Sequence, residues 1–347
     1  MNTGKIIERI ATREREIAPH VLFVDGMSGS GKIVLLTALQ SLERVENHRM
    51  EHIYEFLCTL YYLGRIKEDA ATSLIRLYSD LHCYNNMISR EVNMRPSDLS
   101  SVLNGPKKDL YLSRLEAGEN EDAFKRIEEE SPILHIMTHE NLGMADPLFT
   151  ALGDRCSLIR IVRHPLFVLT SWYSYMDKYA IDPQDFSVCF KYKGKEIPWF
   201  TTGWEEIFLK SNRMDRSIRT VKFLIEQANN NIPKLKQKGY NRFLLIPFEK
   251  FVIEPWEYIG KVETLLNTKR TSATKKVLSD QNIPRKISTD IPDGKIIARY
   301  GYAKMEKNAT EESEALKQWD FIKKEASAEC ITIMEELSND YENTFLS

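Results

Sequence analysis

The segment from residue 20 to residue 42 constrains the fold of this chain more than any other part of the sequence. The apolar run 20–25 precedes Gly26-Met27-Ser28-Gly29-Ser30-Gly31-Lys32, and apolar residues at helical spacing follow. Such a run predicts a strand buried on both faces, and the glycine-rich stretch matches the G-x-x-x-x-G-K spacing of phosphate-binding loops. Inward-pointing backbone N–H groups and a helix N-terminus favour anions there. We therefore predict an anion site, with a ligand-free turn as the alternative, at Ser28, Gly29, Ser30, Gly31, Lys32 and Ile33.

The residue after the loop lysine limits which group-transfer reaction the loop can support. Position 33 is isoleucine, whereas nucleoside-triphosphate hydrolases and kinases with this loop place a serine or threonine there to bind Mg²⁺. A sulfuryl group carries less negative charge than a terminal phosphoryl group, so backbone donors and one lysine could stabilise its transfer. The loop thus favours sulfuryl transfer without a metal, and an ATP-dependent kinase with a degenerate loop remains the alternative.

The composition excludes several other classes of protein. The chain has 347 residues with 48 Lys and Arg against 50 Asp and Glu, so bulk positive charge for binding nucleic acid is absent. Its apolar runs are far shorter than the roughly 18–20 residues that span a bilayer, and the polar start has no signal-peptide core. The five cysteines are scattered and form no C-x-x-C pair. We expect a cytoplasmic protein with free, mostly buried thiols that binds neither nucleic acid nor membrane.

Strand-like runs recur along the chain and define its organisation. They lie at residues 133–137, 157–162 and 242–246, each followed by a turn and a helical stretch. This alternation predicts an α/β fold of the P-loop nucleotide-binding type, with a parallel sheet of four to five strands and helices on both faces. We predict one domain over 1–347, made of a loop unit (20–42), a helical insertion without strands (48–130), the remaining sheet with a second anion site (131–290) and a C-terminal helix (305–347). A hairpin turning at Gly194 is expected within 190–198.

A second motif lies at the end of the strand predicted at 157–162. Arg163-His164-Pro165 opens a helix, and Ser171 follows two turns later. This pattern resembles the R-D-P-R-D-x-x-x-S element of the sulfotransferases that use 3′-phosphoadenylyl sulfate (PAPS). The resemblance implies that Arg163 and Ser171 bind the 3′-phosphate of PAPS and of its product, adenosine 3′,5′-bisphosphate (PAP). This chain departs from the pattern at His164, Leu166 and Phe167, and Gly29 stands where the family loop has its basic residue, so Lys32 is expected to take over charge stabilisation.

A third motif, Thr138-His139, resembles the family's K-T-H element, with Met137 in place of the lysine. The resemblance implies that His139 is the base that deprotonates the acceptor, and the ordinary pKa of histidine suits that task. A purely structural histidine is equally compatible with the sequence. Some family members use a glutamate on the helix after the loop, so Glu51 and Glu55 stay as alternative bases, and His52 is a further candidate.

The last motif, Phe248-Glu249-Lys250-Phe251, resembles a mainly architectural element of the family, and Arg285-Lys286 stands where some members carry basic residues that contact the 3′-phosphate. With four motifs in the family's order between residues 20 and 290, the resemblance implies transfer of a sulfuryl group from PAPS to a hydroxyl or amine of a small-molecule acceptor, without a metal. A catalytically inactive nucleotide-binding module is the remaining alternative. The unmatched segments 48–130 and 175–240 are expected to build the acceptor pocket.

Overall fold

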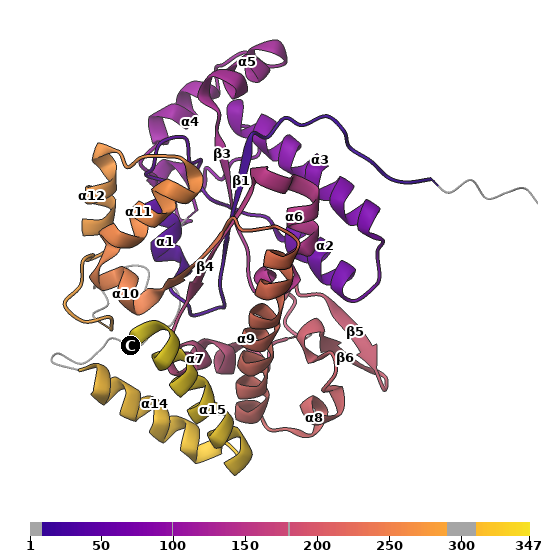
Figure 1. Ribbon diagram of the computed structural model, residues 1–347, viewed down its shortest axis with the longest axis vertical. Coiled ribbons are helices and arrows are strands. Elements are labelled where there is room, and N and C mark those ends of the chain that lie inside the picture. The colour runs from indigo at the N-terminus through magenta and orange to yellow at the C-terminus, as the bar shows by residue number, and fades with distance from the viewer. Residues whose placement is uncertain (1–8, 99, 180, 290–309) are drawn as a thin grey trace, which may run out of the picture.

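The computed structural model describes residues 9–98, 100–179, 181–289 and 310–347 (Figure 1). At its centre lies a five-stranded sheet whose spatial order is β2 (Arg49–Met50), β3 (Ile133–Met137), β1 (His20–Asp25), β4 (Cys156–Val162) and β7 (Phe243–Pro247). All neighbouring strands are parallel, so their carboxyl ends lie along one edge. The predicted α/β fold with four to five parallel strands is confirmed.

Alternate residues of β1 pack into two separate cores, one on each face of the sheet. Val21 and Phe23 belong to one core, and Leu22 and Val24 belong to the other. The larger core is covered by α2 (His52–Tyr62), α3 (Glu68–Met87), α6 (Asp146–Leu152), α7 (Pro165–Met176) and α9 (Arg213–Gln237). The smaller core is covered by α1 (Lys32–Leu39), α10 (Phe248–Ile253), α11 (Pro255–Leu266) and α12 (Ser272–Ser279). Figure 1 shows these two groups of helices on opposite sides of the sheet.

The region predicted as a purely helical insertion, 48–130, is corrected by the structure. β2 lies inside it and pairs in parallel with β3, so the helical cover begins only after Met50. The strand has two residues, too few for an alternating pattern to be recognised in the sequence. After β2 the cover consists of α2, α3, α4 (Lys108–Arg114) and α5 (Glu121–Glu130).

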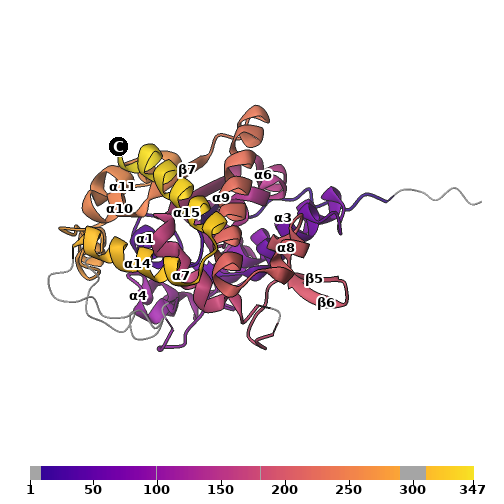
Figure 2. The same ribbon diagram turned by 90° about the horizontal axis from the view of Figure 1, so that it is seen from below.

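The hairpin expected within residues 190–198 is present as β5 (Cys189–Tyr192) and β6 (Lys195–Pro198), which extend beside α8 (Glu205–Lys210) in Figure 2. Its turn contains Gly194 at φ 78°, a left-handed conformation that glycine adopts readily. Short helical turns follow β3 at η2 (Asn141–Met144) and precede β4 at η3 (Gly153–Arg155).

The single C-terminal helix predicted over 305–347 is also corrected. Residues 305–309 lie outside the described residues, and the remainder forms α14 (Glu311–Glu325), α15 (Ala328–Tyr341) and the terminal turn η5 (Glu342–Leu346). The helix breaks at Ala326, which is extended, because the Ser327 side chain accepts a hydrogen bond from the backbone N–H of Cys330 and caps α15.

The five cysteines are free, and four of them are buried. In the described part of the chain, no helix is both long and apolar enough to cross a membrane.

Candidate active site

The glycine-rich loop between β1 and α1 lies against two other elements at positions where only glycine fits. Gly29 has φ +86°, and a Cβ atom there would lie 2.6 Å from Ser171 Oγ on α7. Gly31 has φ +81°, and a Cβ atom there would collide with the ring of Phe248 on α10. Without these side chains the loop backbone packs directly on α7 and α10.

Arg163, which follows β4, contacts the same loop. Its Nη1 donates a hydrogen bond of 2.9 Å to the carbonyl oxygen of Gly29, and its guanidinium lies 4.6 Å from the ring centroid of Phe248 and 5.4 Å from that of Phe167. Arg163 and Ser171 therefore both meet the loop at Gly29. Their binding of a 3′-phosphate stays a prediction.

Lys32, the first residue of α1, is buried beneath the loop. Its Nζ donates hydrogen bonds to the carbonyl oxygens of Gly26, at 2.8 Å, and of Thr138. Burial lowers the pKa of Lys32, while the nearby Glu140, Asp25 and Glu55 act in the opposite direction. An ammonium group has three donors, so one donor remains beyond these two bonds.

Ser30 supplies a second polar group to the loop. Its Oγ is buried and has no hydrogen-bond partner among the residues that the structure describes. A buried hydroxyl without a partner is costly, which favours a ligand or water at this point of the loop.

Glu140 lies at the mouth of the loop and was missed by the sequence analysis, although it directly follows His139. It adopts a left-handed backbone conformation with φ 53°, and its Oε1 accepts a 3.3 Å hydrogen bond from the backbone N–H of Ser28. Burial raises the pKa of Glu140 to about 7, although His139 and Lys32 act to lower it. Glu140 therefore accepts from a loop amide that a bound anion could also use.

His139 and Glu55, proposed from the sequence as alternative bases, form a pair. Glu55 Oε1 accepts a 2.9 Å hydrogen bond from the backbone N–H of His139 and lies 3.0 Å from Nδ1 of the same histidine. His52 Nδ1 lies 3.5 Å from the other carboxylate oxygen. Although burial raises the pKa of Glu55, the charges and hydrogen bonds of His139 and His52 outweigh it and hold the pKa at about 2. Glu55 is therefore an ionised partner of His139 and a weak base.

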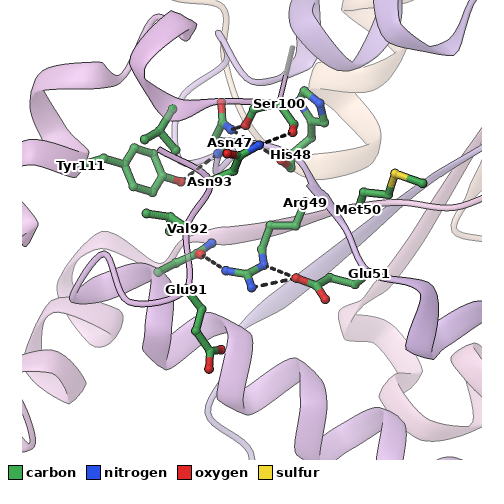
Figure 3. A pocket seen from close by; sticks show the side chains of 12 residues that line it. Asn47, His48, Arg49, Met50, Glu51, Glu91, Val92, Asn93, Ser100 and Tyr111 are labelled. Carbon is green, nitrogen blue, oxygen red and sulfur yellow. Dashed lines mark hydrogen bonds and ion pairs between the residues drawn. The ribbon is translucent and has the colours of Figure 1, made fainter. Parts of the chain in front are cut away.

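Glu51, the other glutamate, lies apart from this pair. It forms an ion pair with Arg49, whose Nη2 lies 2.7 Å from Glu51 Oε1, and its second oxygen lies 3.7 Å from His82 Nε2. Figure 3 shows the Glu51 side chain turned toward Arg49 inside a polar pocket.

Arg285 reaches the site through the Phe248 ring. Its guanidinium lies 5.6 Å from the ring centroid of Phe248, which also stacks on Arg163, and its Nη1 donates to the carbonyl oxygen of Ser288. Lys286 is exposed. The sequence predicts only an architectural role for the Phe248 segment, and nothing in it marks this shared aromatic contact of two arginines.

The C-terminal helices close the turn between β4 and α7. Glu249 accepts hydrogen bonds from the backbone N–H of His164, at 3.1 Å, and from the Tyr341 hydroxyl. His164 Nδ1 caps α7 by accepting from the N–H of Leu166, and its Nε2 lies 3.1 Å from Glu342. His164, a departure from the family motif, thus holds the Arg163 turn in place.

The described residues contain no group of three His, Cys, Asp or Glu side chains arranged to bind a metal ion.

Known proteins that resemble this chain are found among solved structures. No family model matches the sequence, and no curated protein does. Similar solved structures include the sulfotransferase domain of the Synechococcus PCC 7002 olefin synthase (13% identity, TM-score 0.40, covering 91% of this chain and 98% of that one). They also include the sulfotransferase domain of the curacin biosynthetic pathway (14%, 0.44, 92% and 98%) and a sulfotransferase from Alicyclobacillus acidocaldarius (14%, 0.37, 94% and 97%). With TM-scores below 0.5, these likenesses carry no functional assignment, which rests on the site and the motifs alone.

Proposed function

We propose that this protein is a sulfotransferase that transfers a sulfuryl group from PAPS to a hydroxyl or amine of a small-molecule acceptor. The observation that most supports the proposal is the strand order β3-β1-β4. It places His139, after β3, on one side of the anion loop, and Arg163, after β4, on the other. A donor with a sulfuryl group at one end and a 3′-phosphate at the other matches this arrangement.

The residues present fit such a donor. The amides of residues 28–31, the Ser30 hydroxyl and the remaining donor of Lys32 would hold the 5′-phosphosulfate, and Arg163 and Ser171 would hold the 3′-phosphate, with Arg285 nearby. PAPS, when bound, supplies an activated sulfuryl group whose leaving group is PAP. Ionised Glu140 would repel the bound donor, but with a pKa of about 7 much of this carboxyl group is protonated and uncharged near pH 7.

His139 is the proposed base. If its Nδ1–H donates to Glu55 Oε1, Nε2 is the free acceptor on the ring and takes the proton of the acceptor hydroxyl or amine. Glu55 is then a positioning residue, because it fixes this tautomer and stabilises the imidazolium that forms. The same carboxylate holds the backbone of His139 through a second hydrogen bond.

The test is transfer from [³⁵S]PAPS by the full chain in EDTA, measured with a panel of phenols, alcohols, saccharides and amines. We expect labelled product with at least one class, and a loss of about 10²–10⁴-fold in kcat for His139→Ala with little change in PAP affinity. Absence of transfer together with binding of Mg-ATP instead of PAP would favour the kinase alternative. Binding of PAP without transfer to any acceptor would favour an inactive nucleotide-binding module.

A further inference from the structure

Helix α3 carries a line of exposed leucines on its outer side. Leu74, Leu77 and Leu81 are 38%, 43% and 47% exposed, and the half-buried Ala70 and Tyr84 extend the line at either end. Successive members are separated by four, three, four and three residues. This is the heptad spacing with which one helix faces another, and we call these five residues the α3 strip.

The strip is the only part of this helix that faces solvent. From Ala70 to Met87, a stretch that the structure describes completely, the three leucines are the only exposed residues. The two charged residues there are engaged inside the protein, since Arg76 donates to the carbonyl oxygen of Arg13 and Asp80 pairs with the Arg13 guanidinium. A helix face in contact with water ordinarily carries polar and charged side chains. The α3 strip instead offers a surface that only apolar contact can satisfy.

The charges around the strip disfavour a lipid surface as its partner. Three acidic residues stand against one arginine on α3, whereas helices that lie on membranes carry Lys and Arg on their polar face. Asp69 and Asp80 also accept hydrogen bonds from the backbone N–H groups of Ala11 and Ile17. The N-terminal stretch therefore runs beside α3, as Figure 1 shows, and leaves the leucines exposed. Such a strip fits another helix with the same spacing of apolar residues.

The order of side chains makes the strip complementary to itself. Ala70 and Tyr84 each lie seven residues from Leu77. When two copies of α3 run antiparallel about a two-fold axis at Leu77, Leu77 meets its own copy and Leu74 lies beside Leu81 of the other chain. The small Ala70 then leaves room for the large Tyr84. A parallel pair would instead crowd two tyrosines at one end and leave a gap between two alanines at the other.

Both ends of the strip continue into further exposed apolar side chains. Tyr84 contacts Phe124 of α5, with ring centroids 5.5 Å apart, and Phe124 is itself exposed. At the opposite end, the exposed Ile10 directly precedes Ala11, which Asp69 holds against α3. An antiparallel arrangement brings Phe124 of one copy toward Ile10 of the other, so the apolar contact extends past the helices themselves.

We propose that two copies of this chain associate through α3, with their strips packed antiparallel about a two-fold axis at Leu77. Such a contact uses the same patch on both copies, as symmetric dimers do. The strip from Ala70 to Tyr84 is about 21 Å long, and packed helices lie about 8–10 Å apart. An interface of this size corresponds to a weak, reversible dimer. No residue of the strip belongs to the candidate active site, so the inference is independent of the proposed function.

The experiment is sedimentation of the full chain at concentrations from about 1 to 200 µM. We expect a monomer–dimer equilibrium with a Kd of about 1–100 µM. Leu77→Glu and Leu77→Lys each place two like charges at the axis and should raise the Kd at least about tenfold. An equimolar mixture of these two variants should dimerise again, because position 77 meets itself and Glu then faces Lys. Leu316→Glu, which replaces an exposed leucine of α14, is the matched control and should dimerise like the wild type.

Circular dichroism and melting temperature establish that each variant is folded, as expected for substitutions of exposed side chains. The inference is wrong if the wild-type chain stays monomeric up to about 200 µM, or if Leu77→Glu dimerises as tightly as the wild type. It is also wrong if the mixture of folded Leu77→Glu and Leu77→Lys stays monomeric, because the contact would then not be symmetric about Leu77. PAP affinity and sulfuryl transfer of the variants should equal those of the wild type, so the proposed function is judged separately.

Discussion

Glu140 gives the sharpest prediction about the loop, because its carboxylate lies against the Ser28 amide and, when ionised, would repel an anion bound there. Oε1 of Glu140 accepts from the Ser28 N–H, and the pKa of the carboxyl group is about 7. We expect PAP to bind the form of the protein in which Glu140 is protonated. At pH 8 only about one molecule in eleven is in that form, so the apparent Kd is raised about elevenfold, whereas at pH 6 the effect is about 1.1-fold.

The perturbation is Glu140→Gln, which keeps the oxygen that accepts from Ser28 and removes the charge. Its PAP affinity should exceed that of the wild type about tenfold at pH 8, equivalent to about 1.4 kcal/mol, and should equal it within about twofold at pH 6. The phosphates of PAP also gain charge as the pH rises, and comparison at equal pH cancels this contribution. Glu128→Gln, on the exposed face of α5, is the matched control and should follow the wild type.

The assay is isothermal titration with PAP at pH 6, 7 and 8 in EDTA. The same substitution should raise the melting temperature at pH 8, and less so at pH 5. The reason is that folding raises the pKa of Glu140 from its ordinary value of 4.5 to about 7, so this group lowers the stability of the folded chain progressively as the pH rises from about 4.5 to about 7 and by a constant amount above that. Identical pH dependence in wild type and Glu140→Gln would refute the assignment of Glu140 to the anion site.

Three further substitutions test other parts of the site. Arg163→Ala should weaken PAP binding about 10- to 100-fold, as expected for a lost charge-assisted hydrogen bond, and Arg163→Lys should restore only part of the lost affinity. If titration shows that Arg163→Ala binds PAP as tightly as the wild type, the 3′-phosphate assignment is wrong. Gly29→Ala should lower both the PAP affinity and the melting temperature, because residue 29 has a left-handed backbone and the new Cβ would collide with Ser171. Gly64→Ala is the control, because residue 64 is also left-handed but has open space around it, so it measures the cost of the backbone conformation alone. Glu55→Gln should lower kcat with KM for PAPS unchanged, because a neutral amide stabilises the imidazolium less than a carboxylate does. A kcat equal to that of the wild type would show that Glu55 does not position His139.

Much of this architecture follows from local pattern. The buried strand before Gly26, the strands before His139 and Arg163 and the hairpin at Gly194 lie where the sequence predicts them, since apolar runs and glycines specify those elements within a few residues. β2 could not be predicted, because two residues are too few to show an alternating pattern and its position depends on pairing with β3. The split between α14 and α15 depends on a single cap at Ser327.

The site was less predictable, because its main contacts join segments far apart in the chain. Glu55 and His139 appear as rivals in the sequence, and only the packing of α2 beside β3 makes them partners. Glu140 matches no motif, and its role depends on a left-handed turn that brings its carboxylate to Ser28. Phe248 is one aromatic residue among many until the fold stacks two arginines on it.

The central claim is that the loop at Gly29 and the Arg163–Ser171 pair form one site for PAP that needs no metal. Titration of the full chain with PAP in EDTA, against Mg-ATP under otherwise equal conditions, tests it most directly. We predict one PAP bound per chain in EDTA, with affinity greater than that for Mg-ATP. Binding of Mg-ATP with no detectable binding of PAP would contradict the claim.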